Sequence, residues 1–196
     1  MQCEDLIKQR QIELQKGQEI IQNNEKIIQQ LQNSLVLVEY YLKQVQQFSQ
    51  SLTFSTTYKH NHFSVTQNGK LIETSTHVWQ CYMYDQMIPK NGVIQFAVQI
   101  IQINAIMIGI GFRDIVQSNA IKIAILLEEE WEHIAFTFST NDIIIVEVDI
   151  EKKYVKWTKQ STNESFTLTI DTSKDLYPCV HLCGPSKVEI LNQLFK

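Results

Sequence analysis

The sequence predicts a mainly β protein, an antiparallel β-sandwich preceded by one long N-terminal α-helix. A seven-residue apolar repeat through the first 50 residues indicates the helix. The uncharged run 92–112 begins with alternating apolar and polar side chains, as a half-buried strand does. Short β-prone runs between turn residues fill most of the remaining chain, with no helical pattern among them. The predicted domains are a helix over 1–50 and a sandwich over 54–196.

The predicted helix carries an apolar seam along one side. The seam comprises Ile7, Leu14, Ile21, Ile28, Leu31, Leu35, Val38, Leu42 and Val45. The second row of the repeat begins with Arg10, Gly17 and Asn24, and polar residues at such positions fix register at a cost in stability. A single helix with this stripe in water is not self-sufficient. We predict a coiled coil with another copy or another protein; the alternative is a helix folded back on its own sandwich.

The strand pattern places the uncharged run in the middle of a sheet. Ile94, Phe96, Val98 and Ile100 fall on one face of an extended chain, and amide side chains interrupt the apolar run too often for a membrane span. The Asn-Gly pair at 68–69 between β-prone runs predicts a hairpin. The run THVWQCYM at 76–83 predicts a further strand.

Composition argues against one class of function, nucleic-acid binding, and predicts the cellular compartment. The net charge is −4 and no basic stripe occurs, which argues against nucleic-acid binding. Four cysteines show no C-x-x-C pair and the first residues lack an apolar signal core, so we predict a reducing, cytoplasmic location without membrane attachment. Heavy use of Gln, Asn, Ile and Lys suggests an AT-rich protist genome.

The order of motifs after residue 54 resembles that of a SPRY domain, a concanavalin-like jelly roll. The matching segments are a hairpin ending in Gly-Lys (58–70), GVIQFAVQI (92–100), IGIGF (108–112), a strand–Asp–turn–strand unit (142–157), LYPCV (176–180) and VEIL (188–191). A coiled coil leading into SPRY is similar to the C-terminal half of TRIM proteins. No cysteine pairs with zinc spacing precede it, so no RING or B-box is expected. The resemblance implies a non-catalytic scaffold that binds a protein partner through its loops.

Loop and edge residues are the predicted partner contacts, because aromatic and arginine side chains are preferred at binding hot spots. These residues are Tyr82, Tyr84, Asp85, Arg113, Asp114 and Trp131. An alternative function is that of a structural subunit of a cytoskeletal or ciliary assembly, which the uninterrupted helix motivates. We expect oligomerisation through the helix, homomeric or heteromeric, and no cofactor.

Two residue clusters are candidates for a reaction or metal centre. Glu147, Asp149 and Glu151 share one strand face, a pattern that a carbohydrate-binding or glycosidase-like jelly roll uses. We favour a solvated strand edge and predict no catalytic residue. The second cluster, Cys179-Val-His181-Leu-Cys183, places potential zinc ligands on one face, but residues two apart on a straight strand are roughly 6.5–7 Å apart. We therefore predict no metal site.

Overall fold

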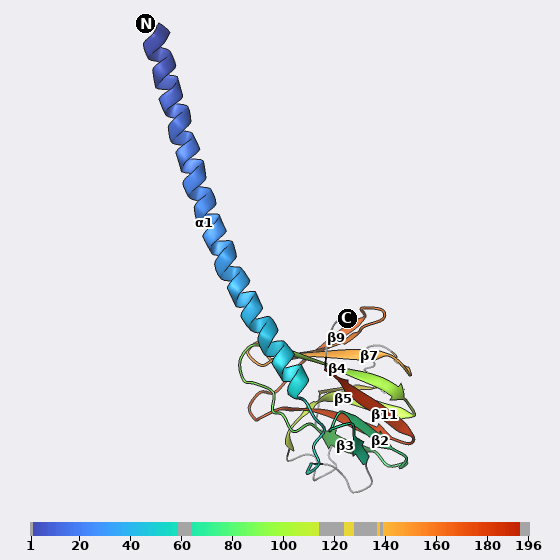
Figure 1. Cartoon of the computed structure of the whole chain (residues 1–196). Coiled ribbons are helices and arrows are strands. Elements are labelled where there is room, and N and C mark those ends of the chain that lie inside the picture. Colours follow the sequence, from blue (N-terminus) through green and yellow to red (C-terminus); the bar gives the residue numbers. More distant parts are fainter. Residues whose placement is uncertain (1, 59–63, 114–123, 128–136, 138, 193–196) are drawn as a thin grey trace. The chain divides into compact units, whose positions relative to one another are not determined.

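The computed structural model describes residues 2–58, 64–113, 124–127, 137 and 139–192 (Figure 1). The chain divides into two compact units, 1–42 and 43–196. The first unit is helical, and the second contains the strands together with the end of the helix. The predicted order of one long helix followed by a β-sandwich is confirmed.

Helix α1 spans Gln2–Ser51 without interruption. Glu4 and Asp5 lie in its first turn, where negative charge interacts favourably with the helix dipole. The helix ends at Ser51, whose hydroxyl donates a hydrogen bond of 2.8 Å to the carbonyl of Phe48. The chain then enters the sandwich core at Leu52, which is fully buried.

The last turns of α1 belong to the β-rich unit. Phe48 is buried in its core, and the Ser49 hydroxyl donates to the Leu191 carbonyl at 3.2 Å. The Lys70 ammonium donates to the carbonyls of Gln50 and Leu52. A cation at this place satisfies carbonyls that have no partner within the helix and interacts favourably with the negative end of its dipole.

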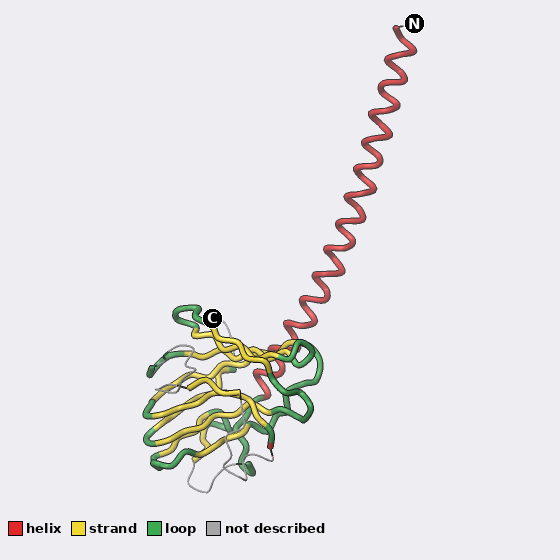
Figure 2. Tube along the Cα trace, turned by 180° about the vertical axis from the view of Figure 1, so that it is seen from behind, coloured by secondary structure: helices red, strands yellow, loops and turns green. Residues whose placement is uncertain are grey.

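Two antiparallel sheets form the sandwich (Figures 1 and 2). The large sheet has the order β1-β2-β11-β4-β7-β8-β9 and the small sheet the order β3-β10-β5-β6. The large sheet consists of β1 (Ser64–Thr66), β2 (Leu71–Thr74), β11 (Ser186–Leu191), β4 (Val93–Gln102), β7 (Ile143–Asp149), β8 (Tyr154–Lys159) and β9 (Ser165–Thr169). The small sheet consists of β3 (Gln80–Met83), β10 (Tyr177–Cys183), β5 (Ala105–Gly111) and β6 (Ala124–Leu127).

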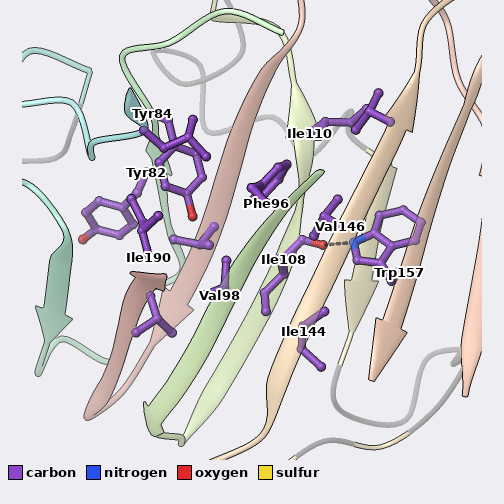
Figure 3. Packing of buried hydrophobic residues seen from close by; sticks show 14 of the residues in the cluster. Tyr82, Tyr84, Phe96, Val98, Ile108, Ile110, Ile144, Val146, Trp157 and Ile190 are labelled. Carbon is purple, nitrogen blue, oxygen red and sulfur yellow. Dashed lines mark hydrogen bonds between the residues drawn. The ribbon is translucent and has the colours of Figure 1, made fainter. Parts of the chain in front are cut away.

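The main core lies between the two sheets (Figure 3). The predicted inward face of β4 is confirmed, because Ile94, Phe96, Val98 and Ile100 are all 3 % exposed or less. Trp157 on β8 is fully buried and donates its indole N–H to the Ile108 carbonyl of β5 at 2.9 Å. That bond ties the large sheet to the small one and satisfies the polar edge of a buried aromatic ring.

Two local predictions have different outcomes. The Asn-Gly hairpin is confirmed: β1 and β2 pair in register, and Asn68 and Gly69 both have positive φ. The strand predicted over 76–83 is shorter than expected. β3 begins only at Gln80, and Val78 and Trp79 before it lie exposed in the preceding loop.

The small sheet has a second buried face, turned away from the main core, which we call the outer face. Cys81, Met83 and Cys179 form a separate buried cluster there, and Tyr58 and Tyr177 pack against it. Their strand neighbours Tyr82 and Val180 belong to the main core instead. The alternation of strand side chains thus places these cysteines on the face opposite to the inter-sheet core.

Candidate functional site

The apolar seam of α1 is the largest exposed apolar feature among the described residues. Eight seam residues, Ile7, Leu14, Ile21, Ile28, Leu31, Leu35, Val38 and Leu42, are 52–66 % exposed, and Val45 is half-buried. Isolated apolar residues on a surface are ordinary, whereas a contiguous stripe marks an interaction surface. Within the part of the chain that the structure describes, α1 lacks the length of apolar sequence that a membrane crossing requires.

Arg113 follows β5 and is held by three neighbours, an arrangement we call the Arg113 clasp. Its guanidinium lies between the rings of Tyr58 and Tyr177, 4.3 Å and 4.0 Å from their centroids. One terminal nitrogen donates to the Asp85 carbonyl at 2.7 Å. The clasp therefore joins the segment after β5 to three others: the segment after α1, the loop after β3 and the start of β10. Two predicted contact residues, Asp85 and Arg113, come together in it.

The other predicted contact residues have different locations. Tyr82 and Tyr84 are 1 % and 0 % exposed, and the ring of Tyr84 stacks on Phe54 at 4.7 Å and meets Phe96 edge-on at 5.9 Å. Burial raises the pKa of both phenols far above the ordinary value. Their side chains support the loop from within. Asp114 and Trp131 lie outside the described residues.

Three exposed apolar side chains flank β3 and were not among the predicted contacts. Val78 and Trp79 precede the strand and are 62 % and 37 % exposed, whereas Met87 follows it and is 39 % exposed. Met87 lies two residues after Asp85, whose carbonyl belongs to the Arg113 clasp. The sequence pattern assigns Trp79 to the strand itself, so it does not stand out as a contact. Trp79 is seen to lie in a loop only once the structure shows that β3 begins at Gln80.

The three carboxylates of β7 and its turn are each held by structural partners. Glu147 accepts hydrogen bonds from the Tyr154 hydroxyl at 2.7 Å and from the Gln95 amide. Asp149 is buried, accepts the Lys152 backbone N–H at 2.8 Å and pairs with its ammonium at 3.2 Å. Glu151 accepts the Gly92 N–H at 3.4 Å. Burial and the hydrogen bond to Glu147 together raise the pKa of Tyr154 to about 12.

A thiol–imidazole cluster occupies the outer face of the small sheet. The ligand atoms of Cys81, Cys179 and His181 all lie within 4.8 Å of one another, and the three residues are 6 %, 0 % and 5 % exposed. A hydrogen bond with Cys179 and the neighbouring His181 together lower the pKa of Cys81 to about 6, although burial opposes the shift. Burial raises the pKa of Cys179. Cys183, the third residue of the predicted cluster, is only half-buried and does not join this group.

Solved structures with the same fold include SPRY domains. The SPRY domain of human HERC1 matches with a TM-score of 0.56 and 16% identity, over 73% of this chain and 99% of that one. The TRIM65 PSpry domain matches at 0.58 and 11%, over 72% and 92%. Stonustoxin matches at 0.58 and 12%, over 71% of this chain and 27% of that one. No family model and no curated protein matches the sequence. The sandwich therefore has the SPRY fold.

Proposed function

We propose that this protein is a non-catalytic interaction protein in which an associating helix carries a SPRY-fold sandwich. The helix binds a second copy or a helix of another protein through the apolar seam. The sandwich binds a protein partner through the loops at the ends of β3. The observation that carries the proposal is the seam itself, with eight aliphatic side chains each more than half exposed along one 50-residue helix.

Burial of the seam is the reason to expect association. Fully burying a Leu or Ile side chain contributes about 1.5–3 kcal/mol relative to leaving it exposed. Side chains that are 52–66 % exposed forgo more than half of that contribution. A heptad spacing aligns them along one line, which is the geometry that a partner helix covers. The spacing thus favours a helical partner over a globular one.

The experiment compares two charge-adding double variants of the full chain. Ile28→Glu with Leu35→Glu places two carboxylates in the seam. Asn23→Glu with Gln30→Glu adds the same charge at the same spacing of seven on exposed positions away from it. Analytical ultracentrifugation and affinity capture from the source cell measure self-association and partner binding, and circular dichroism verifies the helix.

The seam variant is expected to lose self-association, partner capture or both, whereas the matched control behaves as wild type. Wild-type protein that stays monomeric and captures the same partners as the seam variant would refute the role of the helix. Capture that survives in the seam variant but depends on Trp79 and Met87 would assign partner binding to the sandwich alone.

Two further functions remain as alternatives. The long seam also favours a structural subunit of a cytoskeletal or ciliary assembly, for which co-localisation of tagged protein with filaments is the test. The glycosidase-like alternative has weaker support, since Glu147, Asp149 and Glu151 all serve as hydrogen-bond acceptors for the sheet and its turns. Glycan binding that is lost in Glu147→Gln would revive that alternative.

A further inference from the structure

Three potential metal ligands come together on neighbouring strands of the small sheet. In the β3–β10 ladder His181 stands directly opposite Cys81, and Cys179 stands two residues from His181 on the same face. Opposite residues of an antiparallel pair have Cβ atoms about 4.5–5.5 Å apart. Cys81 therefore lies closer to His181, across the ladder, than two residues spaced by two along β10 lie to each other.

The distances suit a single tetrahedral ion. With Zn–S bonds of about 2.3 Å and Zn–N bonds of about 2.0–2.1 Å, ligand atoms of a tetrahedral site lie roughly 3.5–3.8 Å apart. The ligand atoms of Cys81, Cys179 and His181 are within 4.8 Å of one another. Closing the gap requires shifts of about 1 Å or less, which small side-chain rotations supply.

Burial at this place leaves polar groups in need of a partner. His181 is 5 % exposed, and its Nε2 atom has no hydrogen-bond partner among the described residues. Two thiols are weak hydrogen-bonding groups and satisfy an imidazole poorly. A buried imidazole beside two thiols, with one ring nitrogen unsatisfied, is the donor set of a site for a thiophilic metal.

We propose that Cys81, Cys179 and His181 bind one Zn²⁺ ion on the outer face of the small sheet. Two thiolates and a neutral imidazole carry two negative charges, so their Zn²⁺ complex is electrically neutral. Neutrality matters because an uncompensated charge in a site this buried is costly. A Cu⁺ ion, which the same soft ligands accept, leaves one negative charge uncompensated.

The residues that stand opposite the ligands in the two ladders are small or apolar. On the β5 side the residue opposite Cys179 is Gly109, so no side chain projects beside the thiol from that strand. Met107 stands opposite His181, and Met83 opposite Cys179. Both methionines are buried and supply an apolar, polarizable wall. Three protein ligands leave one tetrahedral position for water or another donor.

The first experiment titrates the full-length protein, purified reduced and free of metal, with Co²⁺ and then with Zn²⁺. We expect one Co²⁺ per chain, the thiolate-to-cobalt charge-transfer absorption of a tetrahedral site, and displacement by equimolar Zn²⁺. Cys81→Ser, Cys179→Ser and His181→Gln are each expected to weaken Zn²⁺ binding by more than about 100-fold. Loss of a residue that only hydrogen-bonds to a ligand typically weakens metal binding by about 10–100-fold, so a larger effect identifies the ligands themselves. Cys3→Ser and Cys183→Ser are the matched controls and should bind as wild type.

A second measurement on the unmutated protein guards against variants that fail to fold. X-ray absorption of the Zn²⁺-loaded chain is expected to show two sulfur ligands at about 2.3 Å and at least one nitrogen at about 2.0–2.1 Å. Absence of stoichiometric Zn²⁺ binding, a shell without sulfur, or equal binding by well-folded ligand variants would overturn the proposal. Binding of Cu⁺ without Zn²⁺ would overturn the identity of the ion.

Discussion

Replacing Arg113 with alanine is expected to destabilise the sandwich, because the side chain joins three segments rather than standing free for a partner. A charged donor on a carbonyl contributes about 1.5–3 kcal/mol. Each partly exposed cation–π contact contributes roughly 0.5–1 kcal/mol. Ordering an arginine side chain costs up to about 2 kcal/mol. The net loss of free energy of unfolding in Arg113→Ala is therefore about 1–3 kcal/mol, larger than an exposed arginine would give.

Denaturant and thermal unfolding of the full chain measure this loss. For a domain of this size about 1 kcal/mol shifts the Tm by roughly 2–4 °C, so the expected decrease is about 2–12 °C. Arg113→Lys keeps the charge but lacks the planar fork and should lie between alanine and wild type. Lys90→Ala is the matched control, since the Lys90–Asp175 pair at 2.8 Å is largely exposed and such pairs contribute about 0–1 kcal/mol. A free energy of unfolding of Arg113→Ala within about 0.5 kcal/mol of wild type would refute a stabilising role for the clasp.

Three further substitutions test other parts of the structure. Gly17→Ala should stabilise α1 by up to about 1 kcal/mol, because alanine has the higher helix propensity and its Cβ would meet nothing within 4 Å. Thermal melting followed by the circular dichroism of the helix measures this gain, and a melting curve equal to that of wild type would contradict it. Trp157→Phe should cost about 2–4 kcal/mol in the free energy of unfolding, through the lost bond to the Ile108 carbonyl and the cavity left, and a loss under about 1 kcal/mol would argue against that bond. Burial raises the pKa of Asp142, but the ion pair with Lys159 and the hydrogen bonds from Ser139 and Ser161 bring it below the ordinary 3.8. The ionised carboxylate therefore stabilises the folded state above about pH 3.8, and this stabilisation is lost as the pH falls through the lowered pKa. In Asp142→Asn the free energy of unfolding should consequently fall less steeply with acidification than in wild type.

Periodicity was sufficient to predict the architecture. The seven-residue repeat located a helix that runs to Ser51, and the alternation in β4 identified the four side chains that face the core. Both signals are local, because a helix or strand shows its buried face within a few residues of sequence. The hairpin at Asn68 and Gly69 is local in the same sense, since its positive φ values require those residue types.

Pairings between distant strands were not accessible from the sequence. Cys81 and His181 are 100 residues apart in the chain, and only the β3–β10 ladder makes them neighbours. The prediction considered Cys183 instead, because it lies on the same strand as the other two ligands. Tyr82 and Tyr84 present the same difficulty: both follow a loop, yet strand alternation and burial place them inside. A residue near a loop is exposed only if no second sheet covers it.

The distribution of exposed apolar side chains indicates which surface dominates association. The sandwich uses most of its aromatic residues in the core and exposes Val78, Trp79 and Met87 among the described large apolar residues. The seam exposes eight aliphatic side chains, and burying the remaining half of each would contribute on the order of 8 kcal/mol per helix before association and ordering costs. Under the proposed function, the helix therefore supplies most of the free energy of association, and the few exposed side chains around β3 are suited to choosing the partner. Helix variants should accordingly change the assembly state, and loop variants should change which protein is captured.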